Sequence, residues 1–118
     1  MRAVVRRYDC SASEDLSTYE VDDAPVFGFT LTFAIGSEEG QGEEFFEVLV
    51  ASAAYLSQLQ TTQAPAFLRH VILSSDYNIP AAVTLVEKYI SSLEEESWEK
   101  LAAKINRVLR WEFEDYTA

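Results

Sequence analysis

Few residues of this chain could carry out acid–base or nucleophilic chemistry. His70 is the only histidine and Cys10 the only cysteine among 118 residues. His70 alternates with the apolar residues Leu68 and Ile72, which favours a structural or edge histidine over a catalytic one. Cys10 stands at the end of a predicted strand with no base beside it in the sequence, so it is not expected to act as a nucleophile. Neither residue predicts a catalytic site.

Carboxylates are abundant, but their spacing does not indicate an enzyme or a metal site. Neighbouring acids such as Asp22 and Asp23 could serve as an acid–base pair of the glycosidase type. In a chain with 20 acidic residues, however, such pairs arise from composition alone. The acidic stretches lack the spacing of a calcium loop, and no paired His and Cys residues suggest zinc. We therefore expect no enzymatic activity, no cofactor and no metal.

The distribution of charge is more informative than any single residue. The formal net charge is −11, and no Lys or Arg lies between Arg7 and Arg69. The acids in that interval are Asp9, Glu14, Asp15, Glu20, Asp22, Asp23, Glu38, Glu39, Glu43, Glu44 and Glu47. Such a surface repels phosphate, so nucleic acid is not the expected ligand. It is typical of a soluble protein, and it would also attract a basic protein partner.

Length and composition predict one cytoplasmic domain covering residues 1–118. A hydrophobic content of 48% is sufficient for a continuous core. A single cysteine cannot form an intrachain disulfide, which favours a reducing compartment. The N-terminal arginines are followed by Tyr8, Asp9 and Cys10, where a signal peptide would need a long apolar run. No segment approaches the length of a transmembrane helix.

Strands are expected in the first part of the chain. Residues 2–8 mix valines with arginines and suit an edge strand. The clearest alternation covers residues 26–35, in which one face carries Phe27, Phe29, Leu31, Phe33 and Ile35. A glycine-rich and acidic turn follows, and residues 44–51 are again strand-like. These two strands are expected to form a hairpin with an acidic tip.

Helices are expected mainly in the last third. Residues 53–60 suit a short helix and residues 67–74 a further strand. Asn78 and Pro80 provide the first-turn chemistry of a second helix. A third helix is predicted for residues 97–110, with an apolar stripe formed by Trp98, Leu101, Ala102, Ile105, Val108 and Leu109. This order predicts an α+β fold, with a mainly antiparallel sheet of about four to five strands covered on one side by two to three helices.

The end of the chain carries an aromatic and acidic string, Trp111-Glu112-Phe113-Glu114-Asp115-Tyr116, after a helix that starts Ser97-Trp98-Glu99. Three earlier stretches belong to the same recognisable pattern. They are Phe33-Ala34-Ile35-Gly36, the strand Phe45-Phe46-Glu47-Val48-Leu49-Val50 and Tyr55-Leu56. In this order the features resemble the immunity protein 8 family, bacterial antidotes encoded beside polymorphic or contact-dependent growth inhibition toxins. The resemblance implies an α+β fold, no catalytic site and tight binding of a cognate toxin domain.

Resemblance and charge together predict an immunity protein that binds and neutralises a toxin C-terminal domain by occlusion. That domain is expected to be basic, and a nuclease is one candidate because its surface must attract phosphate. The acids expected to contact it are Asp22, Asp23, Glu38, Glu39, Glu43 and Glu44. The residues expected to serve the fold are Trp98, Trp111, Glu112, Phe113, Glu114, Asp115 and Tyr116, with fully buried aromatics each contributing about 3 to 5 kcal/mol to stability.

Two other functions fit the sequence less well. A small homo-oligomeric interaction protein would use exposed Tyr and Phe side chains as a self-complementary surface. A small enzyme with a carboxylate in a cleft is supported only by the number of acids and aromatic residues. The toxin-binding function ranks first because it alone also accounts for the family resemblance.

Overall fold

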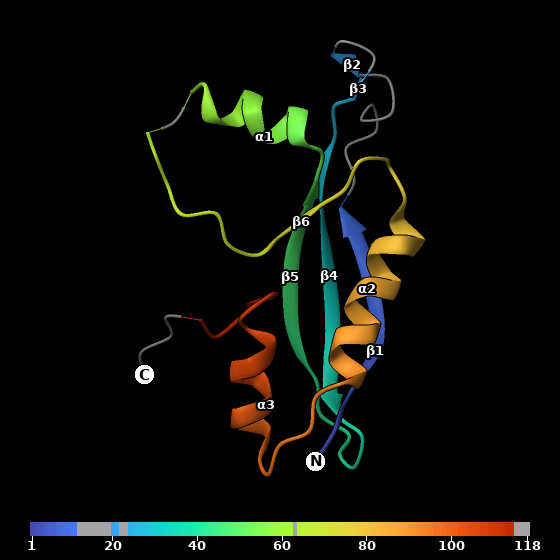
Figure 1. Cartoon of the computed structure of the whole chain (residues 1–118). Helices are drawn as coiled ribbons and strands as arrows, with labels where there is room; N and C mark the ends of the chain where they lie inside the picture. The colour runs from blue at the N-terminus through green and yellow to red at the C-terminus, as the bar shows by residue number, and fades with distance from the viewer. Residues whose placement is uncertain (12–19, 22–23, 63, 115–118) are drawn as a thin grey trace.

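The computed structural model describes residues 1–11, 20–21, 24–62 and 64–114, and its centre is a five-stranded sheet (Figure 1). Four strands follow the order β1-β4-β5-β6, and β7 pairs with β5. The strands are β1 (Ala3–Ser11), β4 (Gly28–Ser37), β5 (Glu44–Ala51), β6 (Val71–Leu73) and β7 (Arg110–Trp111). Only the pairing of β5 with β6 is parallel. A separate short pair consists of β2 (Glu20–Val21) and β3 (Ala24–Pro25).

The helices are α1 (Ala53–Gln60), α2 (Ile79–Ser91) and α3 (Trp98–Ile105). Each begins after a polar N-cap side chain that accepts a backbone N–H bond, as the sequence predicts for Asn78 and Ser97. Helices α2 and α3 lie on the same face of the sheet, while α1 extends from the end of β5 (Figure 1). The predicted α+β fold with a mostly antiparallel sheet is confirmed. Among the described residues, no helix is long and apolar enough to cross a membrane.

The core lies between that face and the two helices. The alternation predicted for β4 is confirmed, because Phe29, Leu31, Phe33 and Ile35 are all at most 2% exposed. Buried residues of α2 and α3, including Ile90 and Leu101, cover them. None of the described helices lies over the opposite face of the sheet. We call it the open face, and its side chains belong to Arg7, Asp9, Thr30, Thr32, Phe45, Glu47 and Leu49.

The connection between α2 and α3 is held by an ion pair between Glu95 and Lys104. The hydrogen bond from the Lys104 ammonium group lowers the pKa of Glu95 below its usual value of 4.5. A carboxylate with a lowered pKa contributes to stability above its ordinary pKa. That contribution fades as the pH falls through the lowered value.

The helix predicted for residues 97–110 is shorter than expected and ends at Ile105. Asn106 is the reason, because its side-chain oxygen accepts a bond from Trp111 N at 3.0 Å and its carbonyl lies 2.7 Å from His70 Nε2. After Ile105 the backbone tightens, with Arg107 N bonded to Lys104 O and Val108 N bonded to Ile105 O, and the Asn106 bonds direct the chain into β7. Val108 consequently leaves the predicted apolar stripe and is 40% exposed.

The strand predicted for residues 67–74 is likewise shorter and consists of Val71–Leu73. The lower part of the β5 edge is already occupied, since β7 pairs there with Phe46 and Glu47. Only Leu49 to Ala51 remain for β6. The chain enters β6 through His70, whose φ of 58° lies in the left-handed region and is incompatible with an extended strand.

Candidate functional site

The tip of the hairpin between β4 and β5 presents two free acidic side chains. Glu38 and Glu39 are exposed, and neither has an ion-pair partner among the residues that the structure describes. The backbone beneath them is fixed by Arg6 of β1. Its guanidinium group donates to the carbonyl oxygens of Ser37 at 2.8 Å and Gly40 at 2.7 Å. The tip is therefore anchored through its backbone, while its carboxylates face solvent.

Glu43 and Glu44, the other two acids predicted at the tip, bind within the chain. The Glu43 carboxylate lies 2.5 Å from Nη2 of Arg7. The Glu44 carboxylate accepts bonds from both indole groups, from Trp98 Nε1 at 2.6 Å and from Trp111 Nε1 at 3.1 Å. Glu44 thus connects the hairpin to the aromatic end of the chain. The structure brings the four acids into one region but leaves only the first two fully available to a partner.

The aromatic residues of the chain end pack on β5. The Trp111 ring stacks on Phe46, with 6.3 Å between ring centroids and an interplanar angle of 11°. Phe113 meets Trp111 edge to face at 5.5 Å and is 37% exposed. Trp98 also contacts Phe46, at 6.4 Å. These rings close the lower edge of the core, which is where a half-buried tryptophan with a bonded indole N–H is expected.

The acids of the chain end also have partners within the chain. Glu112 exchanges two bonds with Phe45, through its backbone N–H and its carboxylate. Glu114 lies 3.1 Å from Arg69 and 3.9 Å from Arg110. Both acids therefore fix the chain end against the sheet. The remaining predicted residues, Asp22, Asp23, Asp115 and Tyr116, lie outside the described residues.

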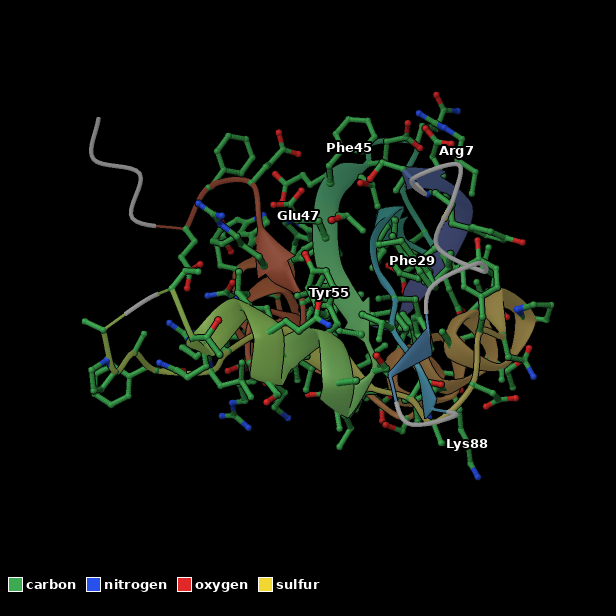
Figure 2. The ribbon with its side chains drawn as sticks, turned by 90° about the horizontal axis from the view of Figure 1, so that it is seen from above. Arg7, Phe29, Phe45, Glu47, Tyr55 and Lys88 are labelled. Carbon is green, nitrogen blue, oxygen red and sulfur yellow. The ribbon has the colours of Figure 1, made fainter. Side chains whose placement is uncertain are left out.

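The open face adds a feature that the sequence reasoning missed. Figure 2 shows Phe45, Glu47 and Arg7 on the side of the sheet away from α2. Phe45 is 42% exposed, and the Arg7 guanidinium lies 5.8 Å from the centre of its ring. Shallow hollows of about 230 and 280 Å³ are both lined by Phe45 and Thr32. The alternation within β5 was the available signal, since Phe45 and Glu47 point opposite to Phe46 and Val48.

A family model described as immunity protein 8 matches residues 3–116. The chain belongs to the immunity protein 8 family. The family resemblance seen in the sequence is thereby confirmed, and the match includes both the hairpin tip and the aromatic chain end. Comparisons with curated proteins and with solved structures gave no match. Family membership makes the chain an immunity protein, and the partner of such a protein is a toxin.

His70 of this immunity protein is placed for a structural contact. Its Nε2 lies 2.7 Å from the Asn106 carbonyl oxygen, which can only accept, so this nitrogen is the donor. Glu47 and Glu114 line a hollow together with His70, and both lie within 3.9 Å of Arg110. In the described part of the chain, no group of three or more His, Cys, Asp or Glu side chains is arranged to hold a metal ion.

Gly36 is required for the close approach at the hairpin tip. A Cβ atom at this position would lie 2.2 Å from the Gly42 carbonyl oxygen and 2.9 Å from Arg6 Nε. The backbone of the tip would have to move and the Arg6 bonds would be disturbed. Gly36→Ala is therefore expected to lower the free energy of unfolding by about 1 to 3 kcal/mol in urea denaturation. Gly42→Ala is the control, because nothing lies within 4 Å of its Cβ position; equal losses would contradict this account.

Proposed function

We propose that this immunity protein neutralises a basic toxin domain by covering the surface that the domain needs for its substrate. The supporting observation is the placement of Glu38 and Glu39 on a fixed backbone at the exposed end of the hairpin. Their carboxylates need not break an ion pair with a described residue before they meet a cationic surface. Opposite charge of this kind raises the rate of association and selects basic partners.

A nuclease is the toxin class that best fits the charge. The active surface of a nuclease must attract phosphate, so it is rich in Lys and Arg. An immunity protein with a net charge of −11 is complementary to such a surface and is itself repelled by nucleic acid. Inhibition then follows from occlusion, and the encounter takes place in the cytoplasm, where a nuclease would reach its substrate.

The contact extends from the hairpin tip onto the open face. The pair formed by Glu43 and Arg7 lies between the two, and Arg7 also covers part of the Phe45 ring. An exposed aromatic side chain beside shallow hollows is typical of the anchor residues that dominate protein interfaces. Phe45 would supply the apolar centre of the contact, with the acids of the tip at its rim.

The direct test is co-purification of the immunity protein with the C-terminal domain of the toxin encoded beside it. Addition of the immunity protein is expected to abolish degradation of DNA or RNA by that domain at a one-to-one ratio. Two outcomes would count against the proposal: a toxin domain that does not degrade nucleic acid would reject the nuclease assignment, and a complex that stays active would reject occlusion.

Phe45→Ser is expected to weaken toxin binding by about 10-fold to 100-fold, because truncation of a central aromatic anchor costs more than 1 kcal/mol. The matched control is Phe67→Ser, since Phe67 is also an exposed phenylalanine but lies in the connection between α1 and β6 rather than on β5. It should bind toxin with the affinity of the unmodified protein. Equilibrium titration of both variants measures the difference, and an unchanged affinity for Phe45→Ser would remove the open face from the interface.

A further inference from the structure

We infer that this immunity protein forms a two-fold homodimer through an apolar groove on its helical side, with Phe67 of each copy inserted in the groove of the other. The dimer goes beyond the proposed function, because its formation needs no toxin. Three features of the described residues support it. They are the groove itself, the exposed apolar side chains around it and the charge of its lining.

The groove has a volume of about 600 Å³ and is lined by all three residues of β6. In Figure 1 the connection from α1 to β6 makes a wide arc without regular structure, while α2 and α3 stand to either side of the remaining space. The walls come from α1, from residues 68–70 of that connection, from β6, from α2 and from the turn after α3. Their apolar members include Leu56, Leu68, Leu73, Leu85 and Val108.

Large apolar side chains are exposed in and beside this groove. Phe67 is 98% exposed, and the side chains that line the groove with large exposures are Leu68 at 69%, Leu73 at 66%, Leu85 at 54% and Val108 at 40%. Together they present about 500 Å² of apolar surface, which is comparable to the largest apolar patch of a typical monomer, a patch that is often functional. A standard interface covers roughly 800 Å² per partner, of which about three fifths is apolar. The patch therefore supplies the apolar area that one copy must contribute.

The charge of the lining is compatible with a second copy as the occupant. The charged side chains that line the groove are Arg69 and Arg107, and none of its lining residues is acidic. By contrast, the hollows on the open face and beside the hairpin tip are each lined by at least one carboxylate. Two molecules of charge −11 repel each other least where acids are absent. A basic toxin would not be attracted by Arg69 and Arg107 in the lining. The groove and the open face therefore suit different partners.

The position of Phe67 makes the patch self-complementary. It is 98% exposed and immediately precedes Leu68, a lining residue, so the chain offers an apolar projection next to an apolar groove. Such a pair allows a two-fold arrangement in which each copy contributes both parts. Phe45 and Glu47 lie on the other side of the sheet, as Figure 2 shows. The dimer would leave both open faces available to toxin.

The test is the molar mass of the purified full chain, without toxin, measured by sedimentation equilibrium over a wide concentration range. A reversible monomer–dimer equilibrium is expected. Phe67→Ser, which removes the inserted side chain, and Leu85→Ser, which changes the α2 wall of the groove, should each raise the dimer dissociation constant by about 10-fold or more. The matched control, Phe45→Ser, should leave it unchanged. Because Phe67 is almost fully exposed, its replacement should not alter urea unfolding at concentrations where the protein is monomeric.

Three results would overturn the dimer. The protein could be monomeric at every concentration, or it could dimerise with the same constant in both groove variants. It could also be monomeric while Phe67→Ser weakens toxin binding, which would assign the groove to the toxin. Since the toxin is absent from the mass measurement, failure of the dimer and failure of the proposed toxin contact are read from separate experiments.

Discussion

Replacing Trp111 by alanine is expected to lower the free energy of unfolding by about 3 kcal/mol, the lower end of the range for a core tryptophan. The variant loses the stack on Phe46 and the edge contact with Phe113. It also removes one of the two indole groups bonded to Glu44. The half-buried position of Trp111 keeps the loss below that of a fully buried ring. Urea denaturation measures the change.

Phe113→Ala provides the comparison within the same segment. From the sequence alone Trp111 and Phe113 have the same predicted role, but Phe113 is 37% exposed and meets Trp111 edge to face. Its loss should cost about 1 kcal/mol. Toxin affinity should be unchanged in both variants at temperatures where they are folded. A small stability loss for Trp111→Ala with abolished toxin binding would instead move the aromatic chain end into the interface.

The second large effect is expected from charge reversal at the hairpin tip. The double change Glu38→Lys and Glu39→Lys should slow association with a basic toxin domain by about 10-fold to 100-fold and flatten its dependence on salt. Stability should not fall, because neither carboxylate has an ion-pair partner among the described residues. Stopped-flow association at several salt concentrations measures the effect. Glu44 is left out of the variant because its reversal would break two indole bonds.

A control with the same change in net charge separates local from global electrostatics. Glu87 of α2 and Glu99 of α3 are exposed acids on the helical side, and the change of both to lysine adds the same positive charge. That variant should slow association only slightly. Equal slowing by the two double variants would show that net charge alone steers the toxin. No slowing by the tip variant would remove Glu38 and Glu39 from the interface.

Local chemistry in the sequence was sufficient for much of the fold. The alternation of Phe29, Leu31 and Phe33 identifies a strand with one buried face, because successive strand side chains point to opposite sides. Asn78 and Ser97 identify helix starts, since each cap is completed within three residues. The ends of elements were less predictable. They depend on partners far away in the chain, as when Asn106 bonds His70 and so ends α3.

For the candidate site, too, the sequence predicted one part and the tertiary structure was needed for the other. The sequence by itself determined that an acidic hairpin tip exists, because Glu38, Glu39, Glu43 and Glu44 flank a glycine-rich turn. Only the tertiary structure decided which of these acids are available. Glu44 meets Trp111 across 67 residues, and Glu43 meets Arg7 of β1. The open face and the apolar groove could not be predicted from the sequence either. Whether a surface is exposed depends on how the helices and strands pack against one another, which local sequence patterns do not determine.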